Sequence, residues 1–255
     1  MVLSVNTNLG AAIALQNLNA TNNRLEKTQL NITTGLRVNG PKDDAATYAI
    51  AQNQRGDIAG YRAVGTALAG GESTVNVAID AGKAISELMI EMKAKIVQSN
   101  QSQIDAASRT ALHRDFVALR DQIDTIVATA EFNGVNVINQ SAVTFQVLST
   151  VDGSVISVSA QKMDTTSLSI NTTTLLTSSG ASAALTTINS AIVSVSDRLA
   201  ALGASSKRLE VQAEFTALEL DAGSAGHLGD QDPHVVAHHR RVHVVVEQRV
   251  DLDRA

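Results

Sequence analysis

The chain has 255 residues, a formal net charge of −5 and no cysteine. Without a basic field, nucleic-acid binding has no electrostatic support, and without cysteine there are no disulfides, thiol catalysis or cysteine metal sites. No apolar run approaches the ~20 residues of a membrane span, so no membrane insertion is expected.

A narrow stripe organises the first helix, which we expect to run from Ala11 to about Thr34. Its positions recur every three or four residues, a spacing typical of a coiled-coil seam. Two of them, Asn22 and Gln29, are polar and can fix the register of the pairing. A stripe this narrow cannot be buried by one helix alone, so it requires partner helices from the same chain or from other copies. The seam consists of Leu15, Leu18, Asn22, Leu25, Gln29, Ile32 and Leu36.

A turn is predicted after the stripe. Gly35 stands where a helix C-terminal glycine is expected, and the loop that it opens runs to Lys42. Asp43 or Asp44 can then cap the next helix, because a carboxylate there meets free backbone N–H groups and the positive end of the helix dipole. Arg37 and Lys42 could also form ion pairs with acidic residues of a neighbouring copy.

Three further helices are predicted, over about residues 45–69, 72–100 and 106–130. The pair Gly70-Gly71 separates the first two, and we expect it to break or bend the chain there. The third helix ends in a turn, which has the sequence Glu-Phe-Asn-Gly at residues 131–134.

Strand-like alternation then replaces the helical period. From Val143 to Ser159, apolar and polar residues alternate around Asp152-Gly153, which is a strong hairpin signal. Residues 160–182 are rich in serine and threonine and weakly patterned. The helical seam returns at Leu185, and this last helix is expected to reach about Leu218.

The composition changes again after that helix. Five of the six histidines lie in residues 227–243, and no lysine follows Lys207. Gly223, Gly226 and Gly229 are expected to interrupt any helical pattern.

The histidine cluster is the most enzyme-like feature of the chain. It includes two i, i+4 pairs, which would bind zinc or nickel on a helix. Pro233 argues against such a helix, and no His-Glu-x-x-His motif occurs, so adventitious metal binding is the simpler interpretation. The cluster consists of His234, His238, His239 and His243.

Sequence motifs of common enzymes are missing. The chain has no P-loop, no dinucleotide fingerprint and no Gly-x-Ser-x-Gly nucleophile motif. We therefore expect no enzymatic activity and no cofactor, and we interpret His113 as a solvated surface residue.

The order of these pieces resembles bacterial flagellin. NTNLGAAIALQNLNATNNRLEKTQLNITTGLRVNGPKDDAATYAIA is similar to the family's N-terminal helix and turn, and GGESTVNVAIDAGKAISELMIEMKAKIVQSN to the long helix that follows. RDFVALRDQIDTIVATAEFNGVNVIN is similar to the next helix with its FNG turn, and INSAIVSVSDRLAALGASSKRLE to the start of the returning helix. The resemblance covers roughly residues 1–216 and is greatest to the compact flagellins of alphaproteobacteria.

The resemblance implies a structural subunit of the flagellar filament, which serves motility. In the family, the terminal helices form an inner coiled coil, where the seam residues would pack, and the other helices form an outer bundle with a β-hairpin. The implied partners are identical or related flagellins, the export apparatus and a chaperone, and the implied location is the extracellular flagellum. The first ten residues lack the basic region and apolar core of a signal peptide, which fits type III export. Residues 164–182 would be exposed.

Two alternatives and one departure stay open. The alternatives are a hook–filament junction protein, which shares flagellin-like ends, and a histidine-based metal-binding protein. The departure is that residues from about Ala217 onwards match nothing of the family's second amphipathic helix, which looks like a frameshifted or replaced C-terminus. The stripe on the first helix would then lack its expected partner, and the inner coiled coil could not form normally.

These observations predict a mainly α protein, an elongated helical bundle or coiled coil with a small β-hairpin insertion. The predicted segments are an N-terminal coiled-coil segment and turn (1–44), a helical bundle (45–134), a hairpin and Ser/Thr-rich insertion (135–182), a returning C-terminal helix (183–218) and an atypical tail (219–255).

Overall fold

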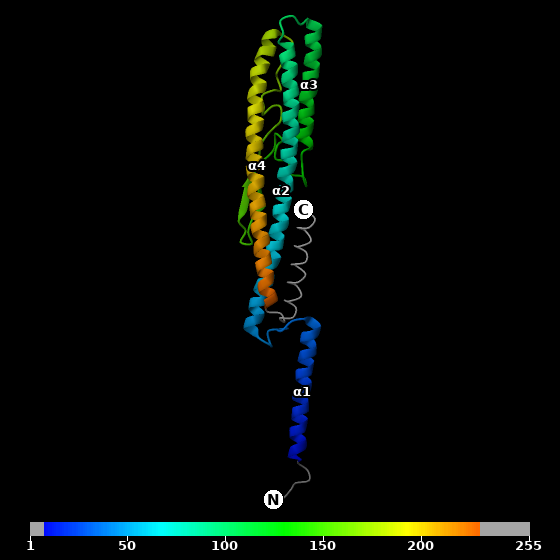
Figure 1. Cartoon of the computed structure of the whole chain (residues 1–255), viewed down its shortest axis with the longest axis vertical. Coiled ribbons are helices and arrows are strands. Elements are labelled where there is room, and N and C mark those ends of the chain that lie inside the picture. Colours follow the sequence, from blue (N-terminus) through cyan, green and yellow to red (C-terminus); the bar gives the residue numbers. More distant parts are fainter. Residues whose placement is uncertain (1–7, 230–255) are drawn as a thin grey trace, which may run out of the picture. The chain divides into compact units, whose positions relative to one another are not determined.

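The computed structural model describes residues 8–229, with side chains as far as Ser224. Within this range the regular secondary structure is helical apart from one small antiparallel sheet, so the predicted mainly α class is confirmed (Figure 1). The elements are α1 (Leu9–Thr34), α2 (Ala45–Ser99), α3 (Ala106–Thr129), β1 (Phe145–Leu148), β2 (Val155–Val158) and α4 (Ser178–Gly229).

The chain divides into two compact units. One comprises residues 61–218, and the other comprises residues 1–60 with 219–255. Helices α2 and α4 each contribute to both units, because the divisions fall within them. The five segments expected from the sequence stay a prediction.

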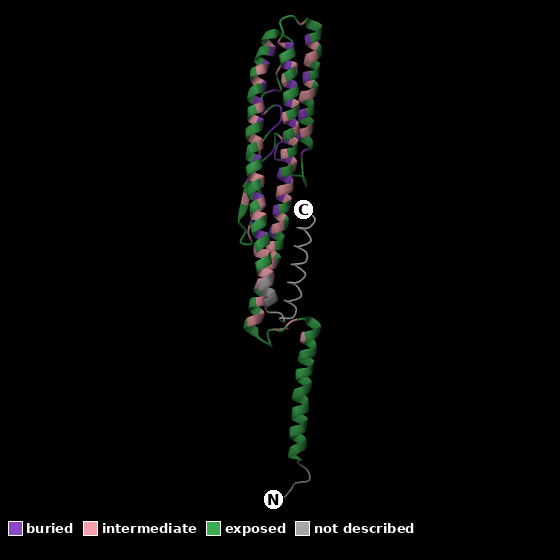
Figure 2. Cartoon of the chain, in the orientation of Figure 1, coloured by how far each residue is buried: buried purple, intermediate pink, exposed green. Residues whose placement is uncertain are grey.

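The unit of residues 61–218 is a helical bundle with a continuous apolar core. Helices α2, α3 and α4 lie side by side in it, and their buried residues face one another (Figures 1 and 2). Helix α3 contributes Phe116, Ile123 and Val127 to this core, all of them buried. A 2.7 Å ion pair between Lys95 of α2 and Asp115 of α3 lies on its surface.

The predicted break at Gly70-Gly71 is wrong, because α2 is one continuous helix of 55 residues. A helical glycine costs only about 1 kcal/mol relative to alanine, which packing can offset. At Gly71 the reason is close approach: an added Cβ would lie 2.6 Å from Cγ2 of Val147 in the hairpin. Gly82 has the same role, since a Cβ there would lie 2.7 Å from Cδ2 of Leu199 in α4. These glycines therefore mark contacts with other elements.

The predicted hairpin is confirmed. Strands β1 and β2 pair antiparallel with Phe145 opposite Val158, and Gly153 supplies a positive φ of 88° in the connecting turn. Val147 and Val158 are buried against the helices. The hairpin therefore covers one side of the bundle core.

The segment between the hairpin and α4 was expected to be exposed from residue 164 onwards, and it is exposed only in part. It has no regular secondary structure, yet it inserts apolar side chains into the bundle. Serine and threonine residues separate these side chains, so the segment shows no helical or strand period. The buried apolar residues are Met163, Leu168, Ile170 and Leu175.

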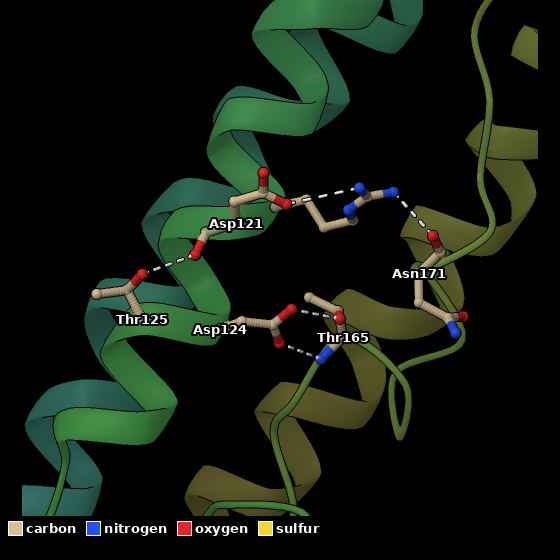
Figure 3. Close-up of polar contacts among 6 residues, drawn as sticks. Asp121, Asp124, Thr125, Thr165 and Asn171 are labelled. Carbon is tan, nitrogen blue, oxygen red and sulfur yellow. Dashed lines mark hydrogen bonds and ion pairs between the residues drawn. The ribbon is translucent and has the colours of Figure 1, made fainter.

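Helix α3 holds this segment by polar contacts. Asp124 accepts hydrogen bonds from the backbone N–H of Thr165 at 3.1 Å and from its hydroxyl at 2.8 Å (Figure 3). Arg120 donates to the carbonyl of Asn171 at 2.8 Å. His113 is half-buried rather than fully solvated, and its Nδ1 accepts from the backbone N–H of a residue in the same segment at 3.4 Å.

Helix α4 is longer than predicted at both ends. It begins at Ser178, where the hydroxyl of Thr177 accepts from the N–H of Gly180 at 3.0 Å and caps the first turn. It continues to Gly229, so Gly223 and Gly226 lie inside the helix, and the predicted interruption is wrong as far as the helix is described. The four clustered histidines of the tail lie outside the described residues.

Candidate functional site

Helix α1 presents nearly its whole surface to solvent, and Asn31 is its one part-buried residue. It has 26 residues and none is buried, and Figure 2 shows it exposed along its length. The four apolar members of the predicted seam that lie on α1 are between 55% and 77% exposed, and its two polar members are exposed as well. Since water surrounds a stripe that could pack against another helix, α1 is the candidate binding surface. The exposed apolar seam residues are Leu15, Leu18, Leu25 and Ile32.

One predicted seam residue does not lie on the helix. Leu36 follows the helix C-cap at Gly35 and is half-buried in the turn. Three apolar side chains that the seam analysis missed, Leu9, Ile13 and Leu30, are 75%, 50% and 50% exposed on α1. They lie off the seam spacing, so periodicity could not have found them. The exposed apolar surface of α1 is wider than a coiled-coil seam.

The turn after α1 is built as predicted around Gly35. This residue has φ 67°, and its N–H donates to the carbonyl of Asn31 at 2.8 Å, which satisfies an end group of the helix. The sequence analysis missed Asn39. Its side-chain amide donates to Oδ1 of Asn31 and to the carbonyl of Leu36, and its Oδ1 accepts from the hydroxyl of Thr34. The turn is therefore fastened to the last turn of α1.

The two aspartates of the turn have different roles. Asp44 caps α2, because its carboxylate accepts from the N–H of Thr47 at 3.1 Å and from the hydroxyl of the same residue at 2.6 Å. Asp43 instead forms a 3.0 Å ion pair with Lys27 of α1 and accepts from the N–H of Asn39 at 3.2 Å. The hydrogen bond from Thr47 lowers the pKa of Asp44, and the one from Lys27 lowers the pKa of Asp43.

The two basic residues of the turn are exposed. Arg37 adds a small electrostatic contribution to the lowered pKa of Asp44. Lys42 lies at the surface. Their pairing with acidic groups of a neighbouring copy stays a prediction.

Acid is expected to loosen this turn. The pKa of each aspartate lies below its ordinary value of 3.8, so the bonds of Asp43 and Asp44 are complete at neutral pH and are lost as the pH falls below that value through the folded-state pKa. The protection of the Thr47 amide against hydrogen exchange, corrected for the intrinsic rate, should therefore fall as the pH drops below 3.8.

Asp44→Asn is the matched variant for this experiment, because asparagine still caps a helix but cannot titrate in this range. Its Thr47 protection should hardly change with pH. Asp57→Asn, at an exposed site on α2, should behave like the wild type. An equal acid-dependent loss in Asp44→Asn would contradict the role of the cap.

None of the helices among residues 8–229 is both long and apolar enough to cross a membrane.

Comparison with known proteins places the chain in a family. The family model for the "Bacterial flagellin N-terminal helical region" matches residues 5–143. Flagellin FljK of Caulobacter vibrioides is 39% identical over 233 residues, which cover 90% of this chain and 85% of that protein. Flagellin B of Rhizobium meliloti is 32% identical over 178 residues, which cover 68% of this chain and 44% of that protein.

Solved structures agree in fold. Bacillus cereus flagellin aligns with a TM-score of 0.53 at 24% identity over 58% of this chain and 86% of that one. A Vibrio parahaemolyticus protein assigned as a flagellar hook-associated protein aligns with a TM-score of 0.61 at 12% identity over 74% of this chain and 99% of that one. At these identities the likeness shows the fold alone. The family match and the identity to the Caulobacter protein together show that the chain belongs to the bacterial flagellin family.

Proposed function

We propose that this flagellin is a structural subunit that polymerises into the extracellular filament of the bacterial flagellum. The observation that carries the proposal is the exposed stripe of α1. A 26-residue helix without a single buried residue gains little from packing within the described residues, whereas most helices in proteins owe their stability to tertiary packing. A partner that covers the stripe would supply the missing stabilisation.

The magnitude of that stabilisation favours association. Burying a leucine or isoleucine side chain contributes about 1.5–3 kcal/mol, and the four apolar seam residues are more than half exposed. Their burial is therefore worth several kcal/mol before the cost of association. Asn22 and Gln29, which lie between them in the sequence, would select the register of pairing.

The same proposal covers partners and location. The partners are other copies of this chain or related flagellins, with the flagellar export apparatus and a chaperone acting before assembly, and the assembled protein is extracellular. The role is structural and not catalytic. The named relatives with detectable sequence similarity are flagellins, which favours a filament subunit over a hook–filament junction protein.

Leu18→Asp tests the proposal. A carboxylate in the stripe should prevent sedimentation of polymer under conditions in which the wild-type chain polymerises, because a packed seam would have to bury the charge. Thermal unfolding followed by circular dichroism should be unchanged, since Leu18 is 57% exposed and makes no core contact. Leu25→Asp should behave in the same way.

Asn23→Asp is the control, because it adds the same charge to an exposed position of α1 that is not in the seam. It should leave polymerisation nearly intact. Normal sedimentation of Leu18→Asp would eliminate the stripe as the assembly surface. A wild-type chain that stays monomeric under all polymerising conditions would count against the function itself.

The segment after Leu218 bears on the same question. The prediction that residues from about Ala217 to Ala255 cannot supply the pairing helix of the inner coiled coil stays a prediction. It is tested by shearing filaments from cells that express this chain. Recovery of the subunit in those filaments at normal levels would refute it.

A further inference from the structure

The chain contains two Asn-Gly dipeptides, Asn39-Gly40 and Asn133-Gly134. In this dipeptide, the backbone nitrogen of glycine can attack the side-chain carbonyl carbon of asparagine, because no Cβ on the glycine obstructs the approach. The attack needs a side-chain amide that can rotate and a backbone that can leave its folded conformation. The two sites differ in both respects.

Asn39 is fixed on all sides. Its side-chain nitrogen donates to Asn31 and Leu36, its side-chain oxygen accepts from Thr34, and its backbone N–H donates to Asp43. Rotating this side chain towards the nitrogen of the next residue would break three hydrogen bonds at once. The turn after α1 thus protects Asn39.

Asn133 is free to react. It is exposed with φ 50°, and in the described part of the chain its side chain has no hydrogen-bond partner. The N–H of Gly134 makes no backbone hydrogen bond, and a Cβ on this residue would meet nothing within 4 Å. Only two backbone hydrogen bonds, both 3.0 Å between Phe132 and Val135, hold the turn closed. Opening such a turn requires little free energy compared with opening the core.

We propose that Asn133 is a site of spontaneous deamidation in the folded protein. The deprotonated nitrogen of Gly134 forms a bond to Cγ of Asn133, and the bond from Cγ to Nδ2 breaks with release of ammonia. Water then opens the resulting succinimide at either carbonyl, which gives aspartate or isoaspartate. No oxidation or reduction takes place, and water is the single co-reactant.

The product places a new negative charge where it is unfavourable. Residue 133 follows the C-terminal end of α3, which already carries the negative end of the helix dipole, and Glu131 is a near neighbour in sequence. The isoaspartyl form also inserts an extra carbon into the main chain of a two-residue turn. Both changes weaken the pairing of Phe132 with Val135, so the modification is a marker of protein age with a structural consequence.

The experiment compares both sites in one molecule. The full chain is incubated at mildly alkaline pH, folded and in urea, and the deamidated fraction of the peptides that contain Asn39 and Asn133 is measured by mass spectrometry. In the folded chain Asn133 should convert about tenfold faster than Asn39, because only Asn39 must first be released from its side-chain bonds. In urea the two rates should become similar.

Two variants complete the test. Asn133→Gln should abolish the acidic species that the folded wild-type chain accumulates in isoelectric focusing, and Asn39→Gln should leave it. Equal or faster conversion of Asn39 in the folded chain would overturn the proposal, as would persistence of the acidic species in Asn133→Gln. The proposal would also be overturned if neither asparagine were deamidated in the folded chain while both were deamidated in urea.

Discussion

Replacing Gly71 by alanine is expected to lower the free energy of unfolding by about 1–3 kcal/mol. The new methyl group would lie 2.6 Å from Cγ2 and 2.9 Å from Cγ1 of Val147. Valine is stiff at χ1, and Val147 is itself buried in the hairpin, so neither side chain can move aside cheaply. Helix α2 and strand β1 would have to separate.

Gly70→Ala is the matched control and should have the opposite sign. The two residues are neighbours in the same helix, but a Cβ on Gly70 would meet nothing within 4 Å. Alanine there should stabilise the protein by about 0.5–1 kcal/mol, because it restricts the unfolded chain. Urea unfolding followed by circular dichroism measures both.

A double variant locates the cause. Adding Val147→Ala to Gly71→Ala should recover part of the lost stability, although Val147→Ala alone is destabilising. If Gly70→Ala and Gly71→Ala had the same effect, both glycines would matter through helix propensity alone and the packing argument would fail.

Asp124→Ala is expected to have the second large effect, a loss of about 1–3 kcal/mol. Its carboxylate accepts from both the N–H and the hydroxyl of Thr165, which is only 3% exposed (Figure 3). Removing the acceptor leaves two buried donors without a partner, and such groups carry the full cost of desolvation. The segment between β2 and α4 should loosen first.

Asp121→Ala provides the comparison on the same helix. The Asp121 side chain is 67% exposed and its ion pair with Arg120 spans 3.5 Å, so its loss should change stability by no more than about 0.5 kcal/mol. Hydrogen exchange at the Thr165 amide should accelerate in Asp124→Ala and not in Asp121→Ala. Unchanged protection of Thr165 in both variants would show that the apolar side chains alone hold the segment.

Local patterns in the sequence were sufficient for most elements. The helical period placed α1 and α3 within a few residues of their observed bounds, and Asp152-Gly153 placed the hairpin, because a turn that needs positive φ favours glycine. Gly35 ended α1 as expected for the same reason. The motifs also predicted the flagellin family correctly.

The errors have a common physical origin. The double glycine in α2 was interpreted as a local break, whereas its second member is required by a strand 76 residues further along the chain. The Ser/Thr-rich segment was expected to be exposed from the resemblance to flagellins, and its sequence has no period that would reveal the buried side chains. Its burial depends on α3 donors and acceptors such as Asp124, which look like ordinary surface residues in sequence.

On α1 and the turn after it, too, the sequence predicted some features and missed others. Periodicity identified the stripe of α1 and its polar positions, because the spacing of residues along one helix determines which of them share a face. It could not show that Asn39 fastens the turn or that Asp43 and Asp44 have different partners, since those depend on how the chain folds back on itself. The sequence by itself thus determined α1, α3, the hairpin and the family. Only the tertiary structure decided which glycines are packing contacts, which loop is buried and which of two asparagines is held, because these follow from distances between residues far apart in the chain.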